Sequence, residues 1–204
     1  MLTTRELEQI TKKVETKSLQ ILDPWDTEKG HNDNCLRVYK YNNFAIKCVY
    51  LEHDKNFEHS NRLSESYNIL LNLNHPNISK VYGLYINKNI KIVVHKFGGR
   101  SLKDLKDLLS NEQKNRILQT VKNSIFYLWK NNISHLDLCP KNILLDNFLR
   151  VTIIDFLDSK IIVQPDKFED CIDMREETIE VKSCCGIYTN KNFNYLKESL
   201  WIKQ

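Results

Sequence analysis

The sequence lacks any apolar run that approaches the roughly 18 residues needed to span a membrane. Its first fifteen residues, MLTTRELEQITKKVE, contain no apolar core of a secretory signal. We therefore expect neither export nor a membrane partner. The 204 residues are 41% hydrophobic and 27% charged, which is typical of a globular protein with one domain or two small lobes.

Cysteine occurs six times but never as a CxxC pair, and only Cys184 and Cys185 lie close together. This spacing predicts neither a disulfide framework nor a zinc site. Reduced thiols are typical of cytoplasmic and nuclear proteins. We therefore expect an intracellular, reducing location.

The formal net charge of +4 is too small to predict a nucleic-acid partner, and no nucleic-acid site is evident. The charge is, however, unevenly distributed. Residues 166–180, DKFEDCIDMREETIE, contain seven acidic residues against Lys167 and Arg175. This segment would attract a basic protein or peptide, and a solvated surface loop is the alternative interpretation.

The first half of the chain is predicted to be rich in strands, because branched and aromatic residues gather between polar turns. A polar loop is expected at 23–34, and Asn42–Asn43 reads as a tight turn. Two helices are also expected, and the second ends before His75–Pro76 because the residue before proline avoids the helical region. Strands are predicted at 19–22, 35–41, 44–50, 77–86 and 89–97, and helices at 5–16 and 57–73.

The second half is predicted to be helical. Gly98–Gly99 interrupts the apolar pattern and marks the expected lobe boundary. Ser110 and Gln113 predict the capping box of a long helix, whose apolar face repeats at Ile117, Val121, Ile125 and Leu128. The predicted fold class is therefore α+β with two lobes, residues 1–98 and 99–204.

Three short motifs follow one another along the chain. They are FAIK at 44–47, HLDLCPKNILL at 135–145 and VTIIDF at 151–156. In this order they resemble the VAIK, HRDLxxxxN and DFG elements of the eukaryotic protein-kinase superfamily. Asp137 and Asn142 are five positions apart, and 13 positions separate Asn142 from Asp155, so a short hairpin could bring the latter two onto one metal site.

The resemblance implies phosphoryl transfer from ATP with Mg²⁺ as cofactors, a reaction that needs positioning and charge neutralisation. Asp137 would act as the catalytic carboxylate that orients the attacking hydroxyl. Asn142 and Asp155 would supply oxygen ligands to Mg²⁺. Lys47 would hold the nucleotide phosphates.

The flanking segments resemble the haspin branch of the superfamily over roughly residues 36–201. NIKIVVHKFGGRSLKDL is similar to the haspin hinge, VTIIDFLDSK to its third motif, and GIYTNKNFNYLKESLWI to its C-terminal segment without an APE motif. The resemblance implies a bilobal kinase fold with a truncated C-terminus, and nucleotide contacts from Ala45, His95 and Phe97. It also implies a chromosome-associated enzyme that phosphorylates a threonine in a basic histone tail.

Kinases pair the strand lysine with a glutamate on the following helix. Counting back from His75–Pro76 in the ordinary register reaches Ser66, whereas the haspin-like register reaches Glu65. We therefore expect Glu65 to pair with Lys47, with a solvated Glu65 as the alternative.

The chain also departs from the family. It has five glycines, and Gly30 stands alone where kinases carry a glycine repeat over the phosphates. Leu136, Cys139 and Leu157 replace the usual arginine, lysine and glycine of the motifs, and Lys141 could substitute for the lysine.

Three interpretations follow from the sequence. The first is an active serine/threonine kinase of haspin type. The second is a pseudokinase that acts as a nucleotide-binding or scaffold module, as the missing glycine repeat favours. A small-molecule kinase related to aminoglycoside phosphotransferases is the third and weakest, because such enzymes usually lack the His75–Pro76 element and the Phe-Gly-Gly hinge.

Overall fold

Residues 1–23 and 35–161 are described here from a computed structural model. Most of the predicted loop at 23–34, the acidic segment 166–180 and the haspin-like C-terminal segment lie outside these described residues. Within the described part of the chain, no helix has both the length and the apolar character that crossing a bilayer takes.

The chain divides into two compact units. The first contains Met1–Leu73 and Ser79–Phe97, and the second contains Asn74–Ile78 together with the chain from Gly98 onward. Asn74–Ile78, which follows the second predicted helix, thus belongs to the later unit although its neighbours in sequence belong to the earlier one.

The first unit is built on a five-stranded antiparallel sheet in the order β1-β2-β3-β5-β4. The register is continuous across the centre, where Phe44–Tyr50 pairs with Ile90–Lys96 in full. Asn42, in the turn between β2 and β3, has a φ of 52°, as expected of an asparagine in a tight hairpin. The strands are β1 (Gln20–Asp23), β2 (Leu36–Tyr41), β3 (Phe44–Tyr50), β4 (Val81–Ile86) and β5 (Ile90–Lys96).

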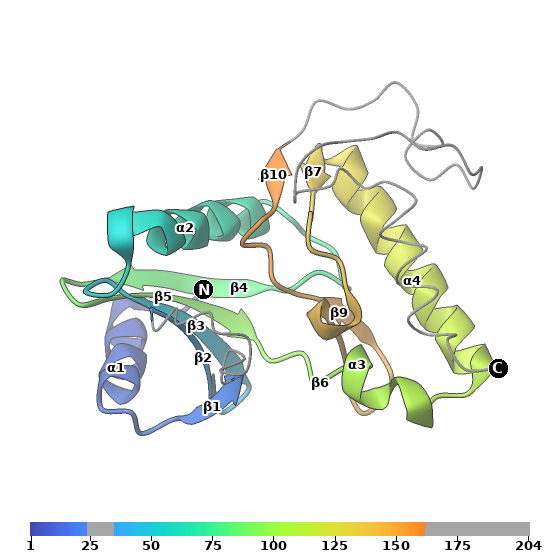
Figure 1. Cartoon of the computed structure of the whole chain (residues 1–204), viewed down its shortest axis with the longest axis horizontal. Coiled ribbons are helices and arrows are strands. Elements are labelled where there is room, and N and C mark those ends of the chain that lie inside the picture. Colours follow the sequence, from blue (N-terminus) through green and yellow to red (C-terminus); the bar gives the residue numbers. More distant parts are fainter. Residues whose placement is uncertain (24–34, 162–204) are drawn as a thin grey trace. The chain divides into compact units, whose positions relative to one another are not determined.

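Helix α1 (Thr4–Glu15) covers one face of this sheet (Figure 1). It begins with the predicted capping box, in which the Thr3 hydroxyl and the Glu6 carboxylate each bond the other residue's backbone N–H. Its apolar side packs against side chains that alternate along three strands, because successive strand residues point to opposite faces. The fully or nearly buried members of this core are Leu7, Ile10, Val14, Tyr39, Ile46, Cys48, Ile90, Ile92 and Val94.

Helix α2 (Glu58–Leu71) covers the opposite face and follows the short 3₁₀ helix η2 (Lys55–Phe57). The Asp54 carboxylate begins α2 by accepting two of its first backbone N–H groups. Lys91 of β5 reaches the helix from the sheet, where its ammonium donates to the carbonyl of Ser60 at 2.8 Å and to the hydroxyl of Ser64 at 2.9 Å. A polar contact therefore holds α2 on the sheet in addition to buried Leu63 and Leu70.

The second unit is organised around the long helix α4 (Asn111–Lys130), which begins with the predicted capping box of Ser110 and Gln113. Its four predicted apolar positions are all buried. Gly99 has a φ of 109° and lies against the carbonyl of Leu145, so this position requires glycine. The other elements are β6 (Arg100–Ser101), α3 (Leu102–Leu105), η3 (Lys106–Leu108), β7 (Ile133–Ser134), η4 (Pro140–Asn142), β8 (Ile143–Leu145), β9 (Val151–Ile153) and β10 (Lys160–Ile161).

Two small sheets complete the second unit. One has the order β6-β8-β9, and the other pairs β10 with β7. The β8–β9 hairpin is short, and its strands pair from Ile143 with Ile153 to Leu145 with Val151. This hairpin joins the two segments on which Asn142 and Asp155 were predicted to meet.

Candidate active site

His135 organises the loop that carries Asp137. The His135 ring is fully buried, and its Nδ1 accepts the backbone N–H of Asp137 at 3.3 Å. Since Nδ1 is the acceptor, Nε2 carries the proton and donates to the carbonyl of Ile154 at 2.8 Å. The same ring packs edge-on against Phe156, with centroids 4.6 Å apart. One imidazole therefore ties the Asp137 loop to the residues on both sides of Asp155.

Asn142 orients Asp137 directly. The Asn142 amide group donates to both the backbone carbonyl and the Oδ2 of Asp137, each at 2.8 Å. Asn142 is buried, whereas Asp137 is exposed. A fixed amide therefore holds an accessible carboxylate in one orientation.

Asn142 also fixes the segment that carries Asp155. The backbone carbonyl of Asn142 accepts the N–H of Ile154 at 2.9 Å. Asp155 itself has a φ of 66°, a left-handed conformation that is uncommon outside glycine and that gathers at functional sites. The hairpin thus holds Asn142, which bonds Asp137, next to the segment that carries Asp155 in the second unit. A metal site shared by Asn142 and Asp155 stays a prediction.

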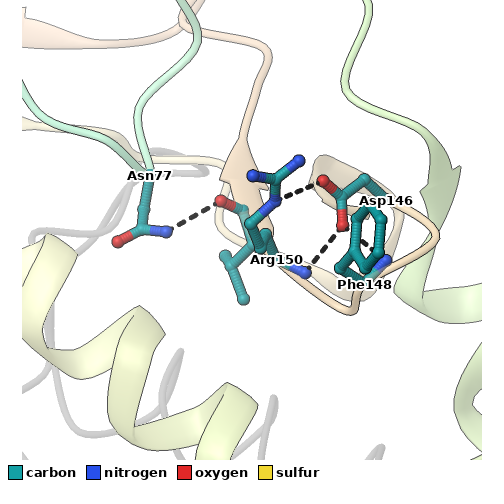
Figure 2. A network of polar contacts seen from close by, with 5 residues as sticks. Asn77, Asp146, Phe148 and Arg150 are labelled. Carbon is teal, nitrogen blue, oxygen red and sulfur yellow. Dashed lines mark hydrogen bonds and ion pairs between the residues drawn. The ribbon is translucent and has the colours of Figure 1, made fainter.

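The turn between β8 and β9 is stabilised by a polar network around Asp146 (Figure 2). Its carboxylate accepts the backbone N–H groups of Phe148 and Arg150 and the Nε of Arg150 at 2.6 Å. Burial opposes ionisation of Asp146, but the bonds from Arg150 and Phe148 outweigh it and lower its pKa. Asn77 donates its side-chain amide to the carbonyl of Val151 at 2.9 Å, which attaches the loop after α2 to the hairpin.

These residues fit a magnesium ion. Mg²⁺ prefers a few protein oxygens completed by phosphate and water. The amide nitrogen of Asn142 is committed to Asp137, which leaves its Oδ1 as the atom that could coordinate a cation. The Asp155 carboxylate would supply the second protein oxygen.

In the first unit, Lys47 lies in the middle of β3 and is buried. Its cross-strand neighbours are Val38 of β2 and Val93 of β5. The Lys47 side chain points to the face opposite α1, because its neighbours Ile46 and Cys48 pack against that helix. A lysine is therefore held on a largely apolar surface of the sheet.

The three predicted nucleotide contacts lie on β3 and β5 or directly after β5. Ala45 lies two positions before Lys47 on β3 and therefore on the same face of the sheet. His95 of β5 is its direct cross-strand partner. Phe97 follows β5, and the ammonium of Lys40 lies 4.7 Å from the centre of its ring. The structure thus places Ala45, His95 and Phe97 at one end of this surface.

Residues 28–179 of the chain match the protein kinase domain family. The chain belongs to this family. It is 32% identical over 130 residues to calcium-dependent protein kinase 6 of Plasmodium berghei, which covers 61% of this chain and 8% of that protein. It is 34% identical over 98 residues to the carbon catabolite-derepressing protein kinase of Saccharomyces cerevisiae, 47% of this chain and 16% of that protein.

A third relative is NUAK family SNF1-like kinase 1 of Homo sapiens, which is 27% identical over 130 residues, 61% of this chain and 19% of that protein. The chain therefore spans less than a fifth of the length of these relatives. The predicted kinase fold class, with a strand-rich first part and a helical second part, is confirmed. Membership in the haspin branch stays a prediction.

The pair expected between Lys47 and Glu65 stays a prediction. Glu65 is exposed on α2, whereas Ser66 is buried and donates its hydroxyl to the carbonyl of Leu63 at 3.0 Å. Successive helix residues are about 100° apart, so a register shift of one position moves a side chain from the buried side to solvent. The structure therefore gives no support to a pair between Glu65 and Lys47, and it places the ordinary-register residue Ser66 on the buried side.

Cys139 stands where most serine/threonine kinase domains carry a lysine. Burial raises the pKa of its thiol, and the negative charges of Asp137 and Asp155 raise it further. Hydrogen bonds from the backbone N–H groups of Asn142 and Lys141 lower the pKa, but by less. The thiol is therefore neutral at physiological pH, and this position lacks the usual cation. Lys141, the predicted substitute, is exposed.

Leu157 replaces the motif glycine without strain. It is buried and is not among the residues with positive φ, so the backbone does not require glycine here. A turn follows, in which Ser159 donates its N–H to Phe156 and its hydroxyl to the carbonyl of His135.

Sequence reasoning missed two contributors to this region. The sequence assigns His135 no role beyond its place in the motif HLDLCPKNILL, although its apolar flanks and motif position mark it as a candidate for a buried hydrogen-bonding residue. The sequence predicts a strand at Asn77, but the Asn77 side chain bonds the β8–β9 hairpin. Its backbone carbonyl also accepts the N–H of Ile153 at 2.7 Å. Only a polar residue directly after Pro76 signalled this role.

Proposed function

We propose that this kinase domain transfers a phosphoryl group from ATP to a serine or threonine hydroxyl of a protein. The observation that carries the proposal is the double role of Asn142. Its side chain orients the exposed carboxylate of Asp137, and its backbone holds the segment that ends in Asp155. This arrangement provides the positioning on which phosphoryl transfer depends.

In the proposed reaction, Asp137 orients the substrate hydroxyl and accepts its proton as the oxygen attacks phosphorus. Asn142 keeps the carboxylate plane fixed during this transfer. Asn142 and Asp155 would hold the metal, and Lys47 would hold the phosphates of the nucleotide. Bound Mg²⁺ would supply charge neutralisation at the phosphates.

The test is the substitution Asp137→Asn in the full chain. Labelled ATP and a panel of peptide substrates should show a loss of phosphotransfer of about a hundredfold or more. Nucleotide binding, measured as the Mg²⁺-dependent rise in Tm with ATP, should stay close to that of the wild type. Asp107→Asn, an exposed aspartate in the same unit, is the matched control. Undiminished transfer by Asp137→Asn would exclude this residue as the base.

A pseudokinase is the second candidate. It is favoured by the neutral thiol at position 139 and by the exposed side chain of Glu65. This candidate predicts nucleotide binding with or without Mg²⁺ but no transfer by the wild type. The same assay distinguishes the two functions.

The haspin type and a histone-tail threonine are narrower proposals. They rest on the resemblance of the hinge and C-terminal segments and on the charge of residues 166–180. Reversing Asp170, Asp173 and Glu177 to lysine should weaken phosphorylation of a basic peptide and flatten its salt dependence. Equal losses on basic and neutral peptides would remove this support, and with it the proposed association with chromosomes.

A further inference from the structure

Three different metal-ligating side chains meet at the beginning of α2. Cys35 lies directly before β2, Asp54 directly before η2, and His59 in the first turn of α2. One ligand atom of each, a sulfur, a carboxylate oxygen and a ring nitrogen, lies within 4.8 Å of the other two. Cys35 is fully buried, Asp54 is 5% exposed and His59 is partly buried, so this is not a cluster of solvated surface groups.

Backbone hydrogen bonds hold the three segments in place. Tyr50 donates its N–H to the carbonyl of Cys35 at 2.7 Å, which anchors Cys35 beside the end of β3. Asp54 accepts the N–H of His59 at 3.0 Å through one carboxylate oxygen and that of Ser60 at 2.8 Å through the other. The ligands are therefore pre-positioned by two parts of the chain, the residue directly before β2 that is Cys35 and the beginning of α2 with Asp54 and His59.

Capping of α2 leaves Asp54 able to bind a cation. An ionised carboxylate offers about four lone-pair sites, and the two backbone N–H groups use two of them. Hydrogen bonds of this kind fix the orientation of metal-ligating carboxylates in known sites. Asp54 can thus begin the helix and bind a metal at the same time.

The combination of ligands selects the metal. Mg²⁺ and Ca²⁺ take oxygen ligands, whereas sulfur and imidazole together favour zinc. Tetrahedral zinc bonds of about 2.0–2.3 Å place ligand atoms about 3.3–3.8 Å apart, so the observed cluster needs a contraction of roughly 1.5 Å at most. A thiolate and a carboxylate would balance the two positive charges of the ion.

We propose that Cys35, Asp54 and His59 bind Zn²⁺ and thereby fasten the beginning of α2 to the beginning of β2. The Cys35 thiol gives its proton to solvent as the Zn–S bond forms, and a water molecule completes the coordination. Lys91 is a charged group near this region, because its ammonium donates to the carbonyl of Ser60 and it interacts electrostatically with Asp54. The site lies within the first unit and is independent of the proposed phosphotransfer.

The full chain, stripped with a chelator, should bind one equivalent of Zn²⁺ by calorimetric titration and should unfold at a higher temperature with Zn²⁺ than without it. Cys35→Ser and His59→Ala should each weaken binding at least tenfold, with little change in Tm in the presence of chelator. If Cys35→Ser fails to fold, the partly buried His59 carries the test. Co²⁺ in place of Zn²⁺ should give the absorption of a thiolate–metal bond, lost in Cys35→Ser.

Cys48→Ser and His53→Ala are the matched controls, since Cys48 packs against α1 and His53 is an exposed histidine next to Asp54. Both should bind Zn²⁺ as the wild type does. A wild type without a Zn²⁺-dependent shift in Tm would overturn the proposal. So would binding that survives Cys35→Ser and is lost in the double substitution Cys184→Ser and Cys185→Ser.

Discussion

The side-chain amide of Asn142 donates two hydrogen bonds to Asp137, one to its backbone carbonyl and one to its Oδ2, and both are 2.8 Å long. The amide therefore fixes both the loop and the carboxylate on it. Asn142 therefore sets the orientation of the proposed base Asp137, in addition to its proposed role as a metal ligand.

Asn142→Asp separates these two roles. The substitution keeps an oxygen for the metal but removes both donated bonds and places a second negative charge against Asp137. We expect phosphotransfer to fall about a hundredfold through loss of orientation, while the Mg²⁺-dependent rise in Tm with ATP persists. Asn147→Asp, in the exposed β8–β9 turn, is the control. A variant that transfers phosphate at the wild-type rate would show that the amide bonds are dispensable.

Cys139→Lys restores a cation beside the two carboxylates. The wild-type thiol is neutral, because burial, Asp137 and Asp155 raise its pKa. A lysine here should neutralise charge on the transferred group and increase the turnover number about tenfold. Cys139→Ser controls for loss of the thiol and should leave turnover nearly unchanged. Identical rates in the lysine and serine variants would mean that this position does not act on the transferred group.

Glu65→Ala should be nearly silent. Its carboxylate is exposed, so its removal should change phosphotransfer and Tm no more than a surface substitution does, within about 0.5 kcal/mol of unfolding free energy. Initial rates with saturating ATP measure this effect, and Lys47→Ala is the sensitive comparison. A loss as large as that of Lys47→Ala would restore the pair predicted from the sequence.

Lys91→Met tests the polar contact between β5 and α2. Burial lowers the pKa of Lys91 while the charge of Asp54 opposes this effect, and the ammonium binds Ser60 and Ser64. Methionine fills the space but leaves the carbonyl of Ser60 without this donor. We expect the free energy of unfolding, measured in urea, to fall by about 1–3 kcal/mol. Lys88→Met is the exposed control, and a gain in stability would mean that desolvation of Lys91 outweighs its bonds.

His75 should make stability depend on pH. Burial lowers the pKa of His75, and its Nδ1 accepts the N–H of Asn77 at 3.2 Å. The folded state thus binds fewer protons than the unfolded state, so the free energy of unfolding falls as the pH drops through the window below about 6.5. In His75→Asn, whose side-chain oxygen can accept the same N–H, this fall should be smaller. His53→Asn, at an exposed position, should retain the full wild-type slope.

Much of the fold could be predicted because its signals are local. The capping boxes at Thr3 and Ser110 and the apolar periodicity after each of them placed both ends of α1 within one residue and placed the beginning and the buried face of α4. The spacing of Asn142 and Asp155 predicted the short hairpin that joins their segments, since a short hairpin has few ways to close.

Other features could not be predicted, because they depend on the exact rotation of a helix or on contacts between distant segments. A shift of one residue in the register of α2 decides whether Glu65 or Ser66 faces the sheet, because neighbouring helix residues are about 100° apart. Sequence patterns do not fix the register of a helix to one residue. Likewise, no spacing rule relates Cys35 to His59, because the hairpin and the turn between them set their distance.

Helix α1 determines where a stable fragment of this domain has to begin. The family match begins at residue 28, after α1 ends at Glu15. A fragment cut to that match would leave Ile46, Cys48 and Ile92 uncovered on the outer face of the sheet. Such a fragment would present a continuous apolar surface and tend to associate with itself. The smallest self-sufficient form of this kinase domain therefore includes residues that the family definition leaves out.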